Sequence, residues 1–585
     1  MKPLLILTAS LFPSFVAGAV QLQTTEVAPV VFEKRGNVLF ADFGKDAYGN
    51  LQIDFSAALP DGVVKVRLGE KLAEDGAIDR KPPGSVSFRE VSFLTKPGRR
   101  HYRLAIPLTP RQRLPVAVKM PSTIGNVTPF RYAEIEGAAL PLEKSGIRQL
   151  FVHAPFQDRA SEFESSDATL NAVWALCKHT IKATTAFGIY IDGERERTPY
   201  EGDTYINLLS HYACDLNPTL ARITFRHLLV HPTWPTEWSL QMPMIAAADY
   251  ELTGNDLIAA SNYEALKKKM LQNRARGDGL LKVTAIVDWP EAERDGYNDG
   301  KLATDVVNQV GPDINTVANA FYYHSLQKMA VLAHALRREG EARDWEACAK
   351  QVYEAFNRVF FDETRGIYVD GEGSSHASLH ANLFPLAFGL VPRARMDIVA
   401  DFVQSRGMAC SVYGAQYLLE ALFAAGRAEA AIHLMTAKTK RSWWHMIELG
   451  STMTTEAWDV QFKKNLTWNH AWATAPANVL SRYVLGVRPI KPGFSEILVA
   501  PELGDLQWVQ GRVPTPLGPV SLKAVNGESF KLEMSIPANA RIEVPLRRAG
   551  EVVVDGKRVD PAPDADHAKA KLGLVGPGTH VIESR

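Results

Sequence analysis

The chain has 585 residues, too many for one ordinary domain, so about two to four domains are expected. Lysine plus arginine and aspartate plus glutamate both total 65, which leaves no net charge to attract the protein to nucleic acid. The hydrophobic content of 46% is ordinary for a globular protein with a large core.

The first 19 residues have the pattern of a secretory signal peptide. Lys2 precedes an apolar run from Leu4 to Val16, and Ala17-Gly18-Ala19 forms an A-x-A cleavage site. This run is too short for a membrane span, and no later segment is apolar enough to cross a bilayer. We therefore expect the mature chain to begin near Val20 and to reside in the periplasm or outside the cell.

Residues 20–142 show the alternation of apolar and polar side chains that is typical of half-buried strands. Leu51, Ile53 and Phe55 alternate with polar neighbours, and glycine and proline punctuate several runs of this kind. The pattern predicts an antiparallel β-sandwich over 20–142. Residues 143–164 follow as a predicted linker that crosses the surface.

The hydrophobic period changes to that of helices over 165–487. Ser166 or Asp167 can cap a helix whose apolar residues recur at spacings of three and four. Helices with the same pattern follow, separated by loops that carry acids and tryptophans. We expect a wholly helical domain of antiparallel hairpins, arranged as an (α/α)6 barrel with its loops at one mouth.

The period returns to two over 488–585, where Asn526-Gly527 and Asp555-Gly556 are typical hairpin turns. A second antiparallel β-sandwich is therefore predicted. The cysteines lack the spacing of metal ligands and lie among apolar residues, so free thiols are expected rather than disulfides. No metal and no cofactor is expected.

The segment 190–212, IYIDGERERTPYEGDTYINLLSHY, concentrates acids between aromatic side chains. Glycine and proline prevent a regular helix, so an irregular turn should bring several carboxyl groups together. Hydrolysis of a sugar bond needs one carboxylic acid to protonate the glycosidic oxygen and a second carboxylate to activate water or attack. A solvated, salt-bridged surface loop is the alternative, but the acids lie between aromatic side chains rather than lysines.

Three later clusters place tryptophan beside acids at predicted loops. They contain Trp238, then Asp288 with Trp289, and finally Glu456 with Trp458, followed by His470. Indole faces stack on the apolar faces of pyranose rings, while acids and histidine bind the hydroxyl groups. A single tryptophan is more often a core residue, and it is the repetition beside acids that favours a sugar site.

The acid segment resembles that of the α-L-rhamnosidases of glycoside hydrolase family 78, in which Asp-Gly or Asp-Cys precedes Arg, an acid, Arg and finally Gly-Asp. The spacing of seven from Glu196 to Asp203 matches. The segment around Glu456 is similar to the family's Thr-Thr-x-Trp-Glu-x-Trp, and further matches are Trp468-Asn469-His470 and Asp288-Trp289. The chain departs from the family by one residue fewer between Asp192 and Glu196 and by Tyr200 where tryptophan is common.

The resemblance, which covers about residues 160 to 490, implies an inverting exo-hydrolase that releases terminal α-L-rhamnose from a glycan or glycoside, with an oligosaccharide or polysaccharide that has rhamnosyl ends as its expected partner. It places Glu196 as general acid and Glu456 as general base. The remaining residues expected at the substrate are Asp192, Arg195, Tyr200, Asp203, Trp238, Asp288, Trp289, Trp458 and His470.

Two other functions stay open from the sequence. A helical-barrel polysaccharide lyase or unsaturated glycuronyl hydrolase would need a tyrosine or histidine base and a group that neutralises a uronate. A catalytically dead glycan-binding protein would bind rhamnosides without turnover. The paired glutamates favour the hydrolase over both.

Overall fold

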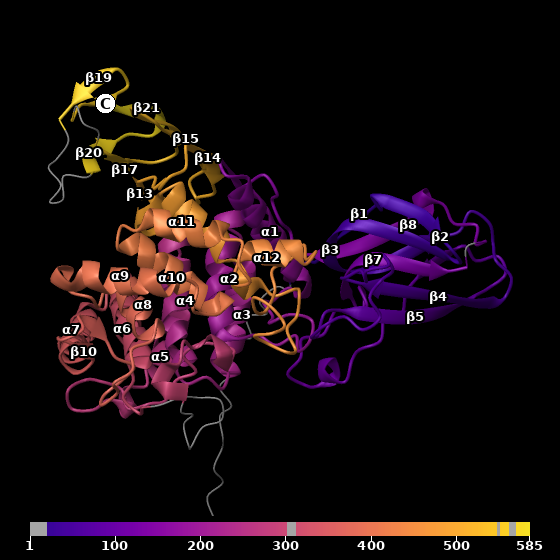
Figure 1. Cartoon of the computed structure of the whole chain (residues 1–585), viewed down its shortest axis with the longest axis horizontal. Coiled ribbons are helices and arrows are strands. Elements are labelled where there is room, and N and C mark those ends of the chain that lie inside the picture. Colours follow the sequence, from indigo (N-terminus) through magenta and orange to yellow (C-terminus); the bar gives the residue numbers. More distant parts are fainter. Residues whose placement is uncertain (1–19, 138, 301–311, 547–549, 561–568) are drawn as a thin grey trace, which may run out of the picture.

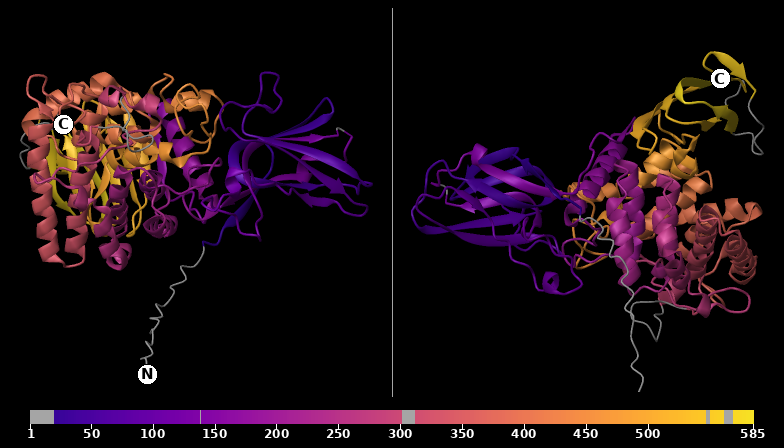
Figure 2. Two further views of the ribbon diagram at one scale, coloured as in Figure 1. Left: turned by 90° about the horizontal axis from the view of Figure 1, so that it is seen from below. Right: turned by 180° about the vertical axis from the view of Figure 1, so that it is seen from behind.

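The computed structural model describes residues 20–137, 139–300, 312–546, 550–560 and 569–585. The predicted signal peptide therefore lies outside the described residues. Within these ranges, no helix combines the length and apolar character that crossing a membrane requires. Two β-domains lie on different sides of a central helical domain (Figures 1 and 2).

The N-terminal domain is one curved antiparallel sheet in the order β1-β8-β3-β7-β4-β5, with β2 and β6 also paired to β3. The predicted alternation is confirmed, since Leu51, Ile53 and Phe55 join one buried core. The strands are β1 (Gln23–Val27), β2 (Val31–Arg35), β3 (Val38–Asp54), β4 (Gly62–Gly69), β5 (Phe88–Thr95), β6 (His101–Arg103), β7 (Thr128–Glu136) and β8 (Ile147–His153).

The prediction of a surface linker over 143–164 is wrong for much of that segment. Strand β8 pairs with β1 and β3 of the N-terminal sheet, and β9 (Glu162–Ser165) pairs with β14 of the C-terminal domain. Both pairings join residues far apart in the sequence, so local periodicity carries little signal for them. The segment therefore pairs through backbone hydrogen bonds with both β-domains.

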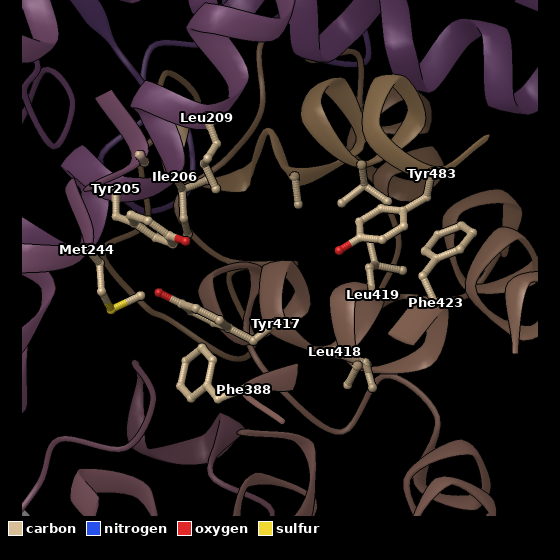
Figure 3. Packing of buried hydrophobic residues seen from close by; sticks show 14 of the residues in the cluster. Tyr205, Ile206, Leu209, Met244, Phe388, Tyr417, Leu418, Leu419, Phe423 and Tyr483 are labelled. Atoms are coloured by element: carbon tan, nitrogen blue, oxygen red, sulfur yellow. The ribbon is translucent and has the colours of Figure 1, made fainter. Parts of the chain in front are cut away.

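The central domain is helical, as predicted, except for a short antiparallel hairpin of β10 (Phe361–Asp362) and β11 (Ile367–Tyr368). Asp167 caps its first helix by accepting a hydrogen bond from the Leu170 N–H. Tyr205, Met244, Phe388 and Tyr417 come from different helices and meet in its core (Figure 3). The helices are α1 (Ala168–Thr184), α2 (Glu201–Cys214), α3 (Thr219–Val230), α4 (Gln241–Thr253), α5 (Leu257–Lys269), α6 (Thr316–Ala335), α7 (Glu339–Val359), α8 (His380–Ala387), α9 (Met396–Arg406), α10 (Val412–Ala424), α11 (Ala428–Thr436), α12 (Trp443–Glu448) and α13 (Ala475–Val479).

The C-terminal domain contains two sheets, ordered β12-β13-β17-β20 and β19-β18-β21-β16-β15-β14-β9. Its β13 and β17 are parallel, which corrects the expectation of purely antiparallel pairing. Asp555 and Gly556 turn between β18 and β19 with positive φ, as a tight hairpin requires. The strands are β12 (Val487–Lys491), β13 (Glu496–Val499), β14 (Trp508–Val513), β15 (Val520–Asn526), β16 (Phe530–Ile536), β17 (Ala540–Pro545), β18 (Val552–Val554), β19 (Lys557–Val559), β20 (Lys569–Val575) and β21 (Gly578–Ser584).

The four cysteines are free, as predicted. Cys177, Cys214 and Cys410 are buried, whereas Cys348 is only half-buried. Burial raises the pKa of the Cys177 and Cys410 thiols well above the ordinary value, so they behave as inert core residues.

Candidate active site

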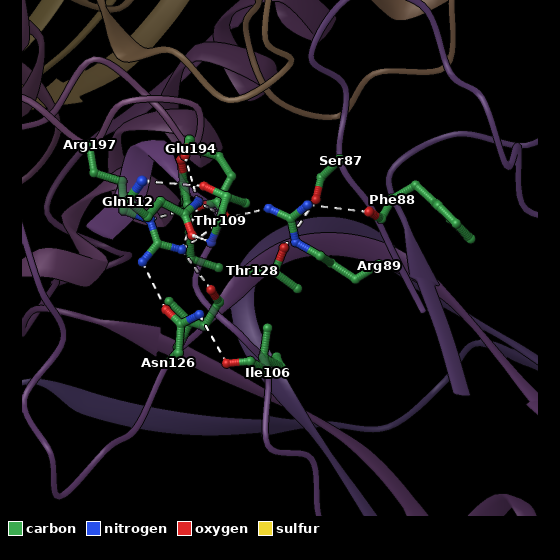
Figure 4. Close-up of polar contacts among 12 residues, drawn as sticks. Ser87, Phe88, Arg89, Ile106, Thr109, Gln112, Asn126, Thr128, Glu194 and Arg197 are labelled. Atoms are coloured by element: carbon green, nitrogen blue, oxygen red, sulfur yellow. Dashed lines mark hydrogen bonds and ion pairs between the residues drawn. The ribbon is translucent and has the colours of Figure 1, made fainter. Parts of the chain in front are cut away.

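The loop between α1 and α2 that carries the predicted acids is anchored to the N-terminal domain. Arg197 is fully buried and donates hydrogen bonds to both Glu194 oxygens, to Asn126 Oδ1 and to the carbonyl of Val127 (Figure 4). Gln112 donates to the Glu194 backbone and side chain at 2.9 and 2.8 Å. Because a buried charge is costly unless it is paired, Arg197 and Glu194 hold this loop in one conformation.

The loop delivers its remaining acids to a cavity of about 240 Å³ at the edge of the helical domain. This volume is below the usual range of about 300–1,000 Å³ for drug-sized ligands, so it suits a group the size of one monosaccharide. We call it the sugar pocket. It is lined by Asp192, Arg195, Glu196, Tyr200, Asp203, Trp234, Trp238, Ile286, Trp289, Glu456, Lys463, Asn465, His470 and Trp472.

Glu196 lies at the mouth of the sugar pocket, where its side chain is 25% exposed. One carboxylate oxygen accepts hydrogen bonds from Arg111 at 2.5 Å and from Arg195 Nε at 3.3 Å. The other accepts a long hydrogen bond of 3.3 Å from the Tyr200 hydroxyl. Burial, and next the Asp192 charge, raise the pKa of Tyr200, so this phenol stays protonated as a donor.

Glu456 lies in the buried part of the pocket and is surrounded by donors. Both terminal nitrogens of Arg195 lie 2.8 Å from its oxygens, Lys463 Nζ lies 3.3 Å away, and the Thr467 N–H donates at 3.0 Å. Burial raises the pKa of Glu456, but the charges of Arg195, His470 and Lys463 outweigh it and leave the pKa below the ordinary 4.5. Glu456 is therefore a carboxylate at neutral pH.

Asp192 is a buried acid of the sugar pocket. Burial, and then the charge of Glu196, raise the pKa of Asp192 well above the ordinary 3.8, although the Thr198 N–H donates to it. A protonated Asp192 can donate a hydrogen bond to a sugar hydroxyl that a carboxylate could only accept.

The deep wall of the pocket presents unpaired polar atoms. His470 Nε2 lies 2.7 Å from Asp203 Oδ1, but its Nδ1 is buried without a partner among the described residues. The Trp238 Nε1 is likewise buried without a partner in this part of the chain. An unpaired buried polar group costs free energy, and both residues line the sugar pocket, so a hydrogen bond between a ligand and either atom would recover that cost.

Two predicted substrate contacts do not reach the pocket. Trp458 is fully buried, meets Trp443 edge-on at 4.9 Å and donates its Nε1 hydrogen to the carbonyl of Cys410. Asp288 is also buried, where it accepts hydrogen bonds from His380 and from the Ser411 hydroxyl and N–H. Both predictions are wrong: Trp458 is a core residue, and Asp288 fixes the backbone before Trp289.

The other predicted residues do line the pocket, and the structure adds Trp234, Ile286, Lys463, Asn465 and Trp472. Trp234 and Trp472 lie within four residues of the predicted Trp238 and His470, so their sequence neighbours could have signalled them. Lys463 has no such signal, because lysine in a loop is usually solvated.

Known proteins are similar to this chain in sequence and in fold. Residues 158–484 match the family model of the bacterial α-L-rhamnosidase six-hairpin glycosidase domain. The chain belongs to this family. Residues 486–559 also match the C-terminal domain of bacterial α-L-rhamnosidases.

Two curated α-L-rhamnosidases are similar in sequence to this family member. The Alteromonas sp. (strain LOR) protein is 25% identical over 319 residues, which are 50% of this chain and 32% of that protein. The Formosa agariphila protein is 24% identical over 359 residues, 57% of this chain and 37% of that protein. The matched regions therefore span about a third of these relatives.

Solved structures show the same fold at lower identity. The α-L-rhamnosidase from Dictyoglumus thermophilum has a TM-score of 0.80 at 19% identity, over 96% of this chain and 64% of that one. The Streptomyces avermitilis α-L-rhamnosidase complexed with L-rhamnose has a TM-score of 0.75 at 17% identity, over 97% and 54% of the two chains.

Proposed function

We propose that this protein is an inverting exo-α-L-rhamnosidase, with Glu196 as general acid and Glu456 as general base. The observation that carries the proposal is that Arg195 bridges two glutamates of different environment across one monosaccharide-sized pocket. Membership of the family supports rhamnose as the sugar. We also propose that the helices form an (α/α)6 barrel, that the curved N-terminal sheet and the two C-terminal sheets each form a β-sandwich, and that the chain is exported.

Glu196 is suited to the role of general acid because it lies at the mouth of the sugar pocket. The glycosidic oxygen of a substrate whose sugar fills the pocket would lie there. Glu196 donates its proton to that oxygen as the bond to the sugar breaks. Glu456, which Arg195 and Lys463 keep ionised, accepts a proton from the water that attacks the opposite face of the sugar. Beyond Glu456 the pocket ends in a buried wall, so the pocket holds one sugar residue. This favours the release of sugars from the ends of chains.

Proton NMR during early turnover of 4-nitrophenyl α-L-rhamnopyranoside tests the stereochemistry. We expect β-L-rhamnose first, with the α anomer growing in only by mutarotation, because inversion requires about 6.5–9.5 Å between the carboxyl groups for a water molecule. The α anomer appearing first, or a glycosyl adduct on Glu456, would contradict the role of Glu456 as base.

Two variants test the two roles. Glu196→Gln should lower kcat/KM by about 10²–10⁴ on a substrate with a poor leaving group and much less on the nitrophenyl substrate, which needs little protonation. Glu456→Gln should lower both alike. Glu448→Gln, at an exposed glutamate that only accepts from Trp444, is the matched control. Equal losses of kcat/KM for Glu196→Gln on the two substrates would show that Glu196 is not the general acid.

Two incubations separate the alternatives. Release of an unsaturated, ultraviolet-absorbing product from a uronate-containing polysaccharide indicates a lyase, and binding of the nitrophenyl rhamnoside without turnover indicates a glycan-binding protein.

A further inference from the structure

A second cavity, of about 560 Å³, opens beside the sugar pocket. We call it the outer groove. Three residues, Glu196, Tyr200 and Trp234, line both cavities. The outer groove is lined by Arg111, Leu114, Pro115, Val116, Glu196, Thr198, Pro199, Tyr200, His227, His231, Pro232, Thr233 and Trp234.

The two walls of the outer groove come from different domains. Residues 111–116 of the N-terminal domain form one wall, and the end of α3 with residues 231–234 forms the other. Glu196 lies where the groove meets the sugar pocket. Since a general acid must touch the glycosidic oxygen, a substrate whose sugar fills the pocket places its leaving group in this groove.

The exposed surface of the groove is mainly apolar. Leu114, Val116 and Trp234 are 51%, 63% and 45% exposed, and all three line this one groove instead of being scattered over the surface. Three prolines, at 115, 199 and 232, add apolar surface without a backbone donor.

Several polar groups of the groove already have partners within the protein. Arg111 donates to Glu196, and Thr233 donates its N–H and hydroxyl to the buried Glu201. The His227 and His231 rings pack at 4.7 Å, and burial, then the neighbouring His231, lower the pKa of His227, so it is uncharged at neutral pH. A sugar ring would leave several hydroxyl groups without partners, and a uronate would compete with Glu196 for Arg111.

We propose that the outer groove binds an aryl leaving group, with Leu114, Val116 and Trp234 as its contact surface. This inference rests on the proposed hydrolase activity and adds the chemical class of the group that the rhamnose is attached to. It makes residues 111–116 of the N-terminal domain determinants of specificity.

The test uses the double variant Leu114→Ser with Val116→Ser, because both side chains line the groove and neither lines the sugar pocket. We expect kcat/KM for 4-methylumbelliferyl α-L-rhamnopyranoside to fall about 10-fold or more, mainly through KM, because apolar contact is lost. Hydrolysis of a rhamnosyl-glucose disaccharide and inhibition by free L-rhamnose should be unchanged.

The matched control is Val63→Ser with Leu94→Ser, a cross-strand pair in the same domain that is 67% exposed at both positions. It should leave all these values unchanged. An equal or larger loss on the disaccharide, or no loss on the aryl substrate, would overturn the proposal.

A binding measurement separates this proposal from the proposed function. Fluorescence titration with 4-methylumbelliferone should show binding that the Leu114→Ser, Val116→Ser variant weakens about 10-fold, with or without hydrolysis. Binding of this kind in a protein inactive on every rhamnoside would refute the hydrolase and retain the groove. Activity on rhamnosides without any Leu114-dependent binding of the free aryl group would refute the groove alone.

Discussion

The two β-domains are attached to the helical domain in different ways. The N-terminal domain reaches the active-site loops with polar side chains: Tyr48 donates to Asn469 Oδ1 at 2.9 Å, Glu70 accepts from Asn469 Nδ2 at 2.8 Å, and Gln112 and Arg111 bind the acid loop. The C-terminal domain is joined through the backbone pairing of β9 with β14 and through apolar packing.

No described residue that lines the sugar pocket belongs to either β-domain, but the N-terminal domain hydrogen-bonds the loops that carry the acids. The contrast indicates that the N-terminal domain positions the active-site loops, whereas the C-terminal domain supports the helical domain through β9 and the core. Polar contacts fix the direction of side chains, while apolar packing tolerates small shifts. The predictions below test this difference.

The largest effect is expected from Arg197→Met at the N-terminal contact. It should lower the free energy of unfolding by about 3–5 kcal/mol, because it removes the ion pair at 2.8 Å and leaves the buried Glu194 with only Gln112 and the more distant Arg89. The control is Arg541→Met in the C-terminal domain, where the arginine is 62% exposed and pairs with Glu496. It should cost at most about 1 kcal/mol. Thermal unfolding of both variants measures the difference, and equal shifts would contradict it.

A pH-dependent effect is expected inside the helical domain. Glu237 is buried and accepts hydrogen bonds from the N–H groups of Ile286 and Val287, and burial raises its pKa from 4.5 to about 7. A raised pKa in the folded state means that its stabilisation is present below pH 4.5 and is lost as the pH rises to about 7.

Wild-type stability should therefore fall relative to Glu237→Gln over this window, by at most about 3 kcal/mol, and stay level above it. Thermal unfolding of both proteins from pH 4 to 9 measures the difference. A difference that does not change with pH would show that the Glu237 pKa is ordinary.

The variants with the smallest expected effect on stability compare the two β-domains most directly, because their activities should differ. At Gly84, an added Cβ would lie 2.7 Å from the Leu466 carbonyl oxygen, and at Gly511 it would lie 2.4 Å from that of Glu162. Gly84→Ala and Gly511→Ala should each cost about 1–3 kcal/mol through overpacking. Only Gly84→Ala should lower kcat, about 10-fold. Leu466 lies between Asn465, whose carbonyl binds Arg195, and Thr467, whose N–H binds Glu456, so a shift of Leu466 would move both contacts. A similar kcat for the two folded variants would mean that the N-terminal domain does not position the base.

The sequence predicted most of the architecture because each domain has its own hydrophobic period. Leu51, Ile53 and Phe55 identified a strand from their alternation alone, and Asp167 marked the first helix by its capping ability. Strand β9 was missed, because its partner Val509 lies in another domain and no local pattern encodes that pairing.

The site was predictable where chemistry is concentrated in one segment, as for Glu196 and its neighbours. A loop position does not, however, fix the direction of a side chain: Trp289 faces the pocket, whereas Trp458 packs against Trp443. For Lys463 the sequence prediction failed in the opposite direction, by leaving out a residue that lines the pocket. An ordinary loop lysine becomes part of the site only because the fold places it 3.3 Å from Glu456.

The β9–β14 pairing also has a consequence for synthesis on the ribosome. Ser165 pairs with Val509, so β9 emerges more than three hundred residues before its partner, a delay of roughly tens of seconds at about 5–20 residues per second. During that time β9 is an open edge on which other nascent chains could assemble. Its alternation places Glu162 and Glu164 on the exposed side, and these negative charges oppose such assembly until β14 arrives.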